Sequence, residues 1–326
     1  MTSRERYKSI LEFRKPDRLP FTEWAPWWDK TLDRWAEEGL ARDMPHYERF
    51  AYFGLEPMDA LHAAPWLPPA PYHGAAVITS EAQYDEMRGE IFSDEHIRKS
   101  CERALELKAR HEADETSTRF TVNGFFWFPR RCFGIEPHLF AFYDHAELMK
   151  RMCADLLAFN MRGISAVTDI VAPDIFHISE DMSYNNGPML SEEMFREFIR
   201  PYYKVLIPHC KKCGLKVFID TDGDVAPMIP WLVESGADGI LPLERQAGVD
   251  IVQIRRDYPG LLLFGGFDKM VMNRGEAAIH AEFERILPVI RSGGYIPGVD
   301  HQTPPGVSLE QFKCFVRVLK EYTQKC

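Results

Sequence analysis

The chain has 326 residues, of which 45% are hydrophobic and 27% charged, and its formal net charge is -10. A single α/β barrel accommodates this length, and the apolar content is sufficient for a large core. The negative charge argues against nucleic acid or an anionic membrane as a partner, because both would repel an acidic protein surface.

No apolar run approaches the roughly 20 residues of a membrane span, and the charged start MTSRERYKSILEFRK is unlike a secretory signal. We therefore expect a cytoplasmic protein that does not enter a membrane. The seven cysteines are odd in number and scattered, which predicts reduced thiols. Cys210 and Cys213 form a lone C-x-x-C, and without a second pair they are better explained as helix-end residues than as a zinc or redox site.

The N-terminal part is predicted to hold two helices, one strand and a cap. The helices are expected over residues 3–13 and 31–39. Residues 18–24, between the helices, have the apolar pattern of a first strand. Prolines at five positions within residues 56–75 argue against both a helix and a central strand, and predict an ordered loop or cap there.

Three tryptophans follow the predicted first strand closely: Trp24, Trp27 and Trp28. Their large apolar rings suit the wall of an aromatic substrate pocket. They suit packing at the mouth of a barrel equally well, so both interpretations stay open.

Beyond residue 93 the chain alternates between strand-like and helical patterns. The strand patterns cover residues 119–129, 173–187 including a loop, 215–220, 238–243, 261–266 and 294–298. The helical patterns cover residues 93–111, 136–167, a segment starting at 191, 227–235, 249–257, 275–291 and 308–322.

Strands that alternate with helices pair in parallel through right-handed crossovers. Seven or eight such units favour closure into a (β/α)8 barrel of the TIM type over an open sheet, here with N-terminal helical and loop additions. Residues 1–326 are thus expected to form one domain, in which 1–115 hold the N-terminal helices, the first strand and the proline-rich cap, and 116–326 hold the remaining units. Neither glycine-rich nucleotide motif, G-x-G-x-x-G or G-x-x-x-x-G-K-S, follows a strand.

The carboxyl ends of the barrel strands are where active sites form, because side chains there point into a cleft above a rigid sheet. In this chain the residues at those ends form an unusually acidic ring. They are Glu23, Trp24, Asn123, Glu180, Asp181, Asp220, Asp222, Glu244, Asp268, Lys269, Asp300 and His301.

Three interpretations of this ring remain open. Asp220, Asp222, Glu244 and His301 could bind zinc or another divalent metal, whose preferred ligands are carboxylate oxygens and imidazole nitrogens. The carboxylates could instead pair with Lys269, with Arg245 or with backbone amides at helix N-termini. Crowded carboxylates also raise one another's pKa, so a protonated one could act as a general acid.

Other polar residues near these strand ends allow a functional and a structural interpretation. His177 lies inside a strand pattern, and a buried, hydrogen-bonded histidine is the favoured reading. Tyr184 and Asn185 could bind substrate, although ordinary loop polarity and the turn chemistry of N-N-G also explain them. Lys269 follows two glycines that would let a ligand approach, and a salt bridge is its alternative.

Several motifs resemble the uroporphyrinogen decarboxylase superfamily, which also contains corrinoid-protein methyltransferases. They span almost the whole chain in the family order: Arg4-Glu-Arg-Tyr, Lys15-Pro-Asp-Arg-Leu-Pro, Glu180-Asp-Met-Ser-Tyr, Pro188-Met-Leu-Ser, Arg200-Pro-Tyr-Tyr, Asp220-Thr-Asp-Gly, Gly265-Gly-Phe-Asp-Lys and Gly294-Tyr-Ile-Pro-Gly-Val-Asp-His. The resemblance implies a distorted (β/α)8 barrel with its site at the strand carboxyl ends.

Two departures from the family pattern narrow the implied function. Where true uroporphyrinogen decarboxylases carry an arginine-rich segment for substrate carboxylates, this chain has Glu23-Trp-Ala-Pro-Trp-Trp-Asp29, which would repel a polyanionic porphyrinogen. Where the best-studied methyltransferases of the family bind zinc through a His-x-Cys pair and a distant Cys, it has Asp220, Asp222 and Val299. What remains resembles an O-demethylase-like branch.

The resemblance therefore implies a methyltransferase that moves a methyl group from a small O-methylated substrate, aromatic ones included, to cobalamin or another corrinoid on a partner protein. The catalytic candidates are Asp222, His301, Glu180 and Asp181. The metal candidates, for zinc or another divalent ion, are Asp220, Asp222, Glu244 and His301. The candidates for contact with substrate are Trp24, Trp27, Asn123, Phe126, Trp127, Tyr184, Asn185 and Lys269.

Two other functions are kept as alternatives. One is a metal-free decarboxylase or lyase acting on a small carboxylate, in which Asp222 protonates a carbanion-like intermediate. The other is a barrel that binds a ligand without chemistry, for which an Asp222→Asn change should leave ligand affinity intact. The sequence also leaves open whether two copies associate as a homodimer.

Overall fold

The computed structural model describes residues 1–25 and 27–326. At the centre of these residues lies a seven-stranded sheet in which all neighbours are parallel and follow chain order. Its strands are β1 (Met58–Ala63), β2 (Ser117–Asn123), β3 (Ile175–Ser179), β6 (Val217–Asp220), β7 (Gly239–Leu241), β8 (Leu262–Phe264) and β9 (Tyr295–Ile296). A hairpin of β4 (Ser183–Tyr184) and β5 (Gly187–Pro188) projects beyond the end of β3.

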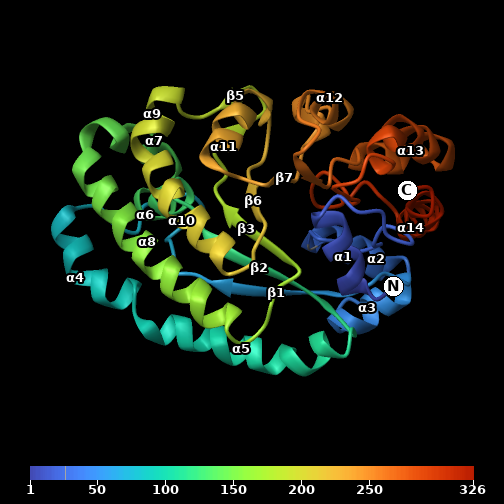
Figure 1. The fold of residues 1–326 in the computed structure, drawn as a ribbon, viewed down its shortest axis with the longest axis horizontal. Helices are drawn as coiled ribbons and strands as arrows, with labels where there is room; N and C mark the ends of the chain where they lie inside the picture. Colours follow the sequence, from blue (N-terminus) through green and yellow to red (C-terminus); the bar gives the residue numbers. More distant parts are fainter. Residues whose placement is uncertain (26) are drawn as a thin grey trace.

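Helices surround the sheet on its outer side (Figure 1). The first five are α1 (Ser3–Leu11), α2 (Asp29–Glu37), α3 (His46–Phe53), α4 (Glu81–Ile91) and α5 (Asp94–Glu112). The next five are α6 (Trp127–Phe133), α7 (Ile135–Asp144), α8 (Ala146–Thr168), α9 (Glu192–Phe198) and α10 (Arg200–Lys212). The last four are α11 (Ile229–Ser235), α12 (Ile251–Asp257), α13 (Glu276–Ile290) and α14 (Leu309–Thr323).

The predicted alternation beyond residue 93 agrees with these elements, except that the strand predicted over residues 119–129 ends at Asn123 and its last three residues belong to α6. Two predictions for the N-terminal part are wrong. β1 lies inside the segment predicted as a loop, since Pro57 precedes the strand and Pro65 follows it, which leaves room for six residues. Residues 18–24, predicted as the first strand, are extended without a strand ladder.

The extended segment nevertheless occupies the gap between the two edges of the sheet. On one side the backbone N–H of Glu56, just before β1, donates to the Phe21 carbonyl oxygen at 2.9 Å. On the other side Trp24 Nε1 donates to the carbonyl oxygen of Val299, just after β9, at 2.8 Å. The segment therefore stands where the eighth strand of a closed barrel would lie.

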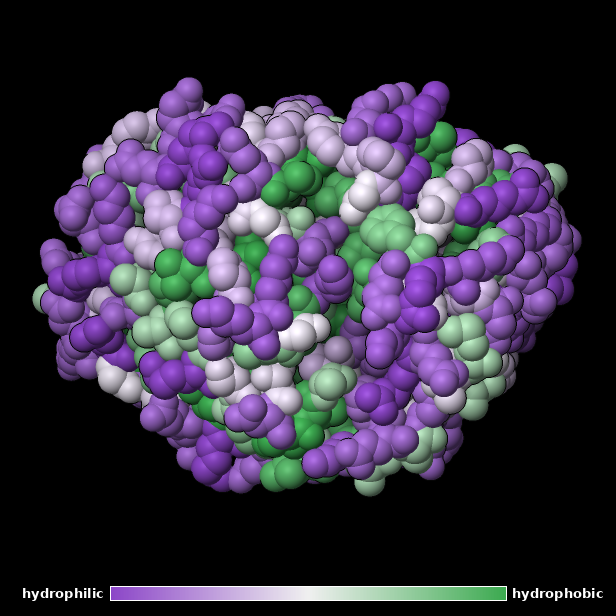
Figure 2. All heavy atoms as spheres, viewed as in Figure 1, coloured by the Kyte–Doolittle hydropathy of each residue, from purple (hydrophilic) through white to green (hydrophobic). Residues whose placement is uncertain are grey.

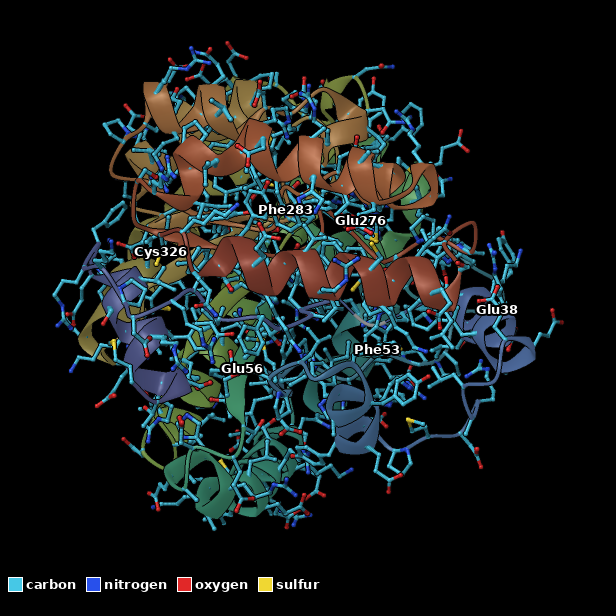
Figure 3. The ribbon with its side chains drawn as sticks, turned by 90° about the vertical axis from the view of Figure 1, so that its right-hand side faces the viewer. Glu38, Phe53, Glu56, Glu276, Phe283 and Cys326 are labelled. Atoms are coloured by element: carbon cyan, nitrogen blue, oxygen red, sulfur yellow. The ribbon has the colours of Figure 1, made fainter. Side chains whose placement is uncertain are left out.

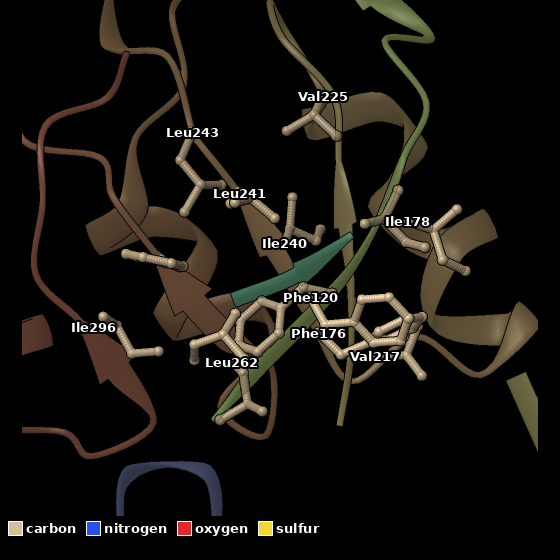
Figure 4. Close-up of a cluster of buried hydrophobic side chains, with 14 of the residues drawn as sticks. Phe120, Phe176, Ile178, Val217, Val225, Ile240, Leu241, Leu243, Leu262 and Ile296 are labelled. Atoms are coloured by element: carbon tan, nitrogen blue, oxygen red, sulfur yellow. The ribbon is translucent and has the colours of Figure 1, made fainter. Parts of the chain in front are cut away.

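The outer face of the sheet is a continuous apolar layer beneath the helices. Phe120, Val122, Phe176, Ile178 and Val217 alternate with inward-facing residues and are at most 1% exposed. The rings of Phe120 and Phe176, which are register neighbours on β2 and β3, lie 5.5 Å apart (Figure 4). Burial of each such side chain contributes about 1.5–3 kcal/mol, which holds the strand ends rigid.

The helix α14 packs beside α13 and close to the N-terminal helices (Figure 3). Its Phe312 ring lies 4.8 Å from Trp35 and 4.8 Å from Phe53, in one aromatic cluster with Trp27. These contacts join the N-terminal helices to the C-terminal helix. They lie on the side of the barrel where residues 18–24 fill the gap in the sheet.

Hydrophilic side chains cover most of the face seen in Figure 2, with apolar ones in small patches between them. All seven cysteines are free thiols, and Cys210 is buried at the end of α10. None of the helices in the described part of the chain combines the length and the apolar composition that crossing a bilayer requires.

Candidate functional site

A pocket of about 230 Å³ opens at the carboxyl ends of the strands. Loops that follow β3, β6 and β9 contribute to it, although they are far apart in sequence. Its lining consists of Trp24, Ala25, Trp127, Ser179, Asp181, Asp220, Asp222, His301 and Gln302. Of the groups predicted to meet at the barrel mouth, Asp181, Asp220, Asp222 and His301 thus face one cavity.

Three of the four predicted metal ligands lie close together. One ligand atom from each of Asp222, Glu244 and His301 falls within 4.8 Å of the other two. His301 Nε2 is 3.5 Å from Asp222 Oδ2. This donor set and spacing fit zinc or another divalent ion with a coordination position left for a ligand.

Asp220, the fourth predicted ligand, is not part of this group. Its Oδ2 accepts a hydrogen bond from Ser179 Oγ at 3.1 Å, which turns the carboxyl group toward β3. The prediction of Asp220 as a metal ligand is therefore not supported by its position, whereas its place in the pocket wall suits a proton donor.

The loop Asp220-Thr-Asp-Gly is fixed by the β4–β5 hairpin. Thr221 Oγ1 accepts hydrogen bonds from the backbone N–H groups of Met182 (2.8 Å) and Ser183 (3.1 Å). Ser183 Oγ in turn donates to the Asp222 carbonyl oxygen at 2.6 Å. Gly223 has φ +80°, and a Cβ there would collide with the backbone of Tyr184, so this turn requires glycine. These contacts hold Asp222 in place.

Behind the metal candidates, Asp300 joins two loops. Its buried carboxylate accepts hydrogen bonds from the backbone N–H of Arg245 at 2.9 Å and of Lys269 at 3.2 Å. Lys269 Nζ lies 3.4 Å from Asp300 Oδ1 and 3.5 Å from Glu244 Oε1. The ammonium group is engaged by these two carboxylates, so the predicted role of Lys269 in substrate binding does not fit its position.

Three groups around the pocket hold protons more tightly than usual. Burial, and then repulsion from Asp222, raises the pKa of Asp220 to about 7. The same two causes raise the pKa of Asp181 to about 6. A hydrogen bond to Asp222 raises the pKa of His301 above its ordinary value. The pocket therefore presents groups able to donate a proton near neutral pH.

Glu180 was predicted to be catalytic, and its surroundings contradict that role. Its fully buried carboxylate accepts hydrogen bonds from the backbone N–H groups of Phe125 (2.9 Å), Phe126 (2.7 Å) and Trp127 (3.3 Å). A fourth comes from Tyr203 Oη at 2.7 Å. A Cβ at residue 124 would collide with this carboxylate, which explains Gly124. Glu180 caps the start of α6 and does not face the pocket.

The predicted aromatic walls divide into two groups. Trp24 and Trp127 line the pocket. Trp27 is only 8% exposed and packs in the cluster with Trp35 and Phe312, so it lies in the core. Phe126 is fully buried against His138, with ring centroids 4.5 Å apart. The roles of Trp27 and Phe126 in substrate contact are therefore corrected to packing.

The remaining substrate candidates lie outside the pocket lining. Tyr184 is 49% exposed in the β4–β5 hairpin, and Asn185 is exposed at its turn, so both point to solvent. Asn123 ends β2 and is buried next to Ser179 in the register of β3. Its side-chain Nδ2 has no hydrogen-bond partner among the described residues.

Three residues at or beside the site were not predicted from the sequence. Ser179 lies two positions beyond His177, so strand alternation could have placed both on the inner face. Gln302 gave no signal beyond its place after His301. Arg130, on α6, forms an ion pair with Asp181 at 3.1 Å, and only the three-dimensional arrangement reveals it.

Comparisons with known proteins address the fold and the family. A family model described as uroporphyrinogen decarboxylase (URO-D) matches residues 135–322. No curated protein sequence matches the chain. A solved structure titled as a methyltransferase from Methanosarcina mazei superposes with a TM-score of 0.67 at 14% identity, covering 99% of each chain.

A putative vitamin-B12 independent methionine synthase from Listeria monocytogenes is similar more loosely, with a TM-score of 0.47 at 13% identity over 94% of this chain and 98% of that one. The family match and the Methanosarcina structure confirm the predicted α/β barrel of the TIM type.

Proposed function

Because the chain belongs to the uroporphyrinogen decarboxylase family, we propose that it is a cytoplasmic methyltransferase acting on a small O-methylated substrate and a corrinoid partner protein. The single observation that supports this most is the meeting of Asp222, Glu244 and His301 beside a small pocket with tryptophan walls. A site of that size suits a small molecule, and an acidic pocket does not suit a porphyrinogen with many carboxylates.

The chemistry of demethylation explains why such a site needs acid groups. When a methyl group leaves an ether oxygen, that oxygen takes the electron pair of the broken C–O bond and becomes an alkoxide or phenolate. Such a group leaves poorly unless a proton or a metal stabilises its charge. A corrinoid on the partner supplies the cobalt nucleophile that accepts the methyl group.

The residues of this pocket can stabilise the leaving oxygen in two ways. Asp222, Glu244 and His301 would hold a divalent metal, which would supply Lewis acidity. Without a metal, the His301 imidazolium or the Asp220 carboxyl group would donate a proton to that oxygen. Trp24 and Trp127 would enclose the apolar part of the substrate and exclude water.

The two versions predict opposite pH profiles. If a carboxylic acid donates the proton, activity should fall as pH rises above about 7, because the pKa of Asp220 is about 7. If a metal is the acid, activity should fall at low pH instead, because protons compete for Asp222, Glu244 and His301. Elemental analysis of the purified protein tests independently whether a metal is the acid. Absence of a stoichiometric divalent ion would contradict the metal version.

Decarboxylation of a small carboxylate is the second candidate, and the protonated state of Asp220 near neutral pH favours it, since a carbanion needs a proton donor. The products separate the two functions. Methyl transfer yields a demethylated alcohol or phenol and a methylated corrinoid, whereas decarboxylation releases carbon dioxide without any corrinoid. Carbon dioxide release from the substrate would overturn the proposed methyl transfer.

A further inference from the structure

The inner face of β1, β2 and β3 is polar, in contrast to the apolar outer face. Ser179 lines the pocket and is in register with Asn123, so alternation places Arg119, Thr121 and Asn123 on the same inner side of β2. His62 on β1 and His177 on β3 are both in register with Thr121. Thus four nitrogen-bearing side chains share this face: His62, Arg119, Asn123 and His177.

Among the described residues, the guanidinium of Arg119 lacks an ion-pair partner. Its guanidinium makes no hydrogen bond or ion pair with any residue in 1–25 or 27–326, and its Cζ lies 5.6 Å from the centroid of the Trp24 ring. The charges of Asp220 and Glu23 act on Arg119 from a distance, but neither carboxylate forms an ion pair or hydrogen bond with its guanidinium.

Two further donors on this face lack partners. Asn123 is 7% exposed, and its Nδ2 has no partner among the described residues. His177 is 3% exposed; its Nε2 bonds to Thr121 Oγ1 at 2.7 Å, while Nδ1 has no partner in the same part of the chain. Burial, then the charge of Arg119, lowers the pKa of His177, so its ring is neutral and Nδ1 carries the free proton when Thr121 donates.

Unpartnered donors are costly in a folded protein. A buried polar group without a hydrogen bond loses its hydration with no compensation, and an unpaired charge loses more. The barrel interior beside Arg119 is open, since Ala60 and His62, which are in register with Arg119 and Thr121, are solvent-exposed although they face the barrel axis. A carboxylate bound in this interior would supply acceptors to the guanidinium and to the buried amide and imidazole donors on the same face.

We propose that Arg119, Asn123 and His177 bind the carboxylate group of the substrate inside the barrel. The substrate would then be a small O-methylated carboxylic acid, with its acid group held by β2 and β3 and its methoxy group directed to Asp222 and His301. The anion site stands on the geometry of β1–β3, while the orientation of the methoxy group rests on the proposed function.

A binding experiment tests the anion site directly. Titration calorimetry would compare 3-methoxybenzoate and smaller acids such as methoxyacetate with the matching neutral alcohols. We expect the wild type to bind at least one acid about 10-fold more tightly than its alcohol. Arg119→Met should reduce that preference to within about 2-fold, whereas Arg131→Met, which removes an exposed charge from nearby α6, should preserve it.

The proposal is overturned if none of the acids binds, if wild type binds acid and alcohol equally, or if Arg119→Met retains the preference. A second measurement covers the case in which Arg119 is purely structural. Loss of an unpaired cation should leave the melting temperature of Arg119→Met equal to that of the wild type or raise it by a few degrees. A lowered melting temperature, with no acid preference in the wild type, would assign Arg119 to the fold.

The outcomes also separate this site from the proposed function. An acid preference that depends on Arg119, in a protein that never methylates a corrinoid, would support the anion site and refute the methyl transfer. Methyl transfer from a neutral methoxy compound at the rate seen with its acid would support the proposed function and refute the anion site.

Discussion

Two sets of carboxylates at the same end of the barrel, one buried and one half-buried in the pocket wall, differ in how many hydrogen bonds they receive. Glu180 accepts bonds from three backbone amides and the Tyr203 hydroxyl. Asp300 accepts bonds from two backbone amides and pairs with Lys269. In the pocket wall, Asp220 accepts a bond from Ser179 alone among side-chain donors of the described residues.

This difference separates carboxylates that stabilise the fold from carboxylates that can take part in a reaction. A carboxylate whose lone pairs are all used holds loops together, because any ligand would have to replace those bonds. A carboxylate with unused lone pairs that faces a cavity can hold a proton, a metal or a substrate group. A carboxylate at a strand end is therefore a candidate site residue. The number of hydrogen bonds that the protein donates to it indicates whether its role is structural or chemical.

The largest expected effect is on stability, at Glu180. Glu180→Ala leaves the amides at the start of α6 and the Tyr203 hydroxyl without their acceptor, and we expect it to lower the free energy of unfolding by about 3–5 kcal/mol. Urea unfolding measures this change. Glu193→Ala, which removes an exposed carboxylate on α9, is the matched control and should change stability by less than about 0.5 kcal/mol. Equal stability of the two variants would refute the structural role.

Substitution of Asp220 is expected to change the free energy of unfolding less, and to raise it instead of lowering it. Its folded pKa of about 7 lies above that of an unfolded aspartate, so its contribution to stability is present below about pH 4 and is lost as pH rises through 7. Asp220→Asn cannot ionise, and should exceed the wild type in free energy of unfolding at pH 8 by about 1–3 kcal/mol.

Unfolding in urea at pH 5 and pH 8 would reveal this pH dependence, because the advantage of Asp220→Asn should grow between the two values. A variant that is less stable than the wild type at pH 8 would show that Asp220 is a structural carboxylate like Glu180.

The smallest effect is expected in the exposed hairpin. Tyr184→Ala and Asn185→Ala alter side chains that point to solvent, so each should change stability by less than about 0.5 kcal/mol and activity by less than about 2-fold. Steady-state assays and thermal unfolding suffice. A 10-fold loss of activity in either variant would return the hairpin to the substrate site.

The sequence predicted the convergence of Asp222, Glu244 and His301 because it depends on a general rule. Strand and helix periods located the strand ends, and parallel strands place all their carboxyl ends at one edge. The same rule could not assign roles at that edge. Asp220 and Asp222 are two residues apart, yet only Asp222 joins the candidate metal group.

Other features of the site and fold could not be predicted, because they depend on tertiary contacts that a local sequence pattern does not contain. Trp27 and Phe126 have the same aromatic character as Trp24 and Trp127, and only packing against Trp35 or His138 separates core from pocket. Residues 18–24 have a strand-like pattern, but they close the barrel without a ladder. No sequence pattern marks Arg119 as a site residue. What distinguishes it is that its guanidinium has no ion-pair partner among the described residues, which a sequence cannot show.

Asp222, Glu244 and His301 are the proposed reactive centre of a methyl transfer. The most direct test mixes the purified protein with an O-methylated carboxylic acid and a reduced corrinoid protein, and follows methylcobalt formation by absorption. We predict formation by the wild type and a loss of about 100-fold or more in Asp222→Asn with the fold intact. Undiminished methylcobalt formation by folded Asp222→Asn would contradict the account.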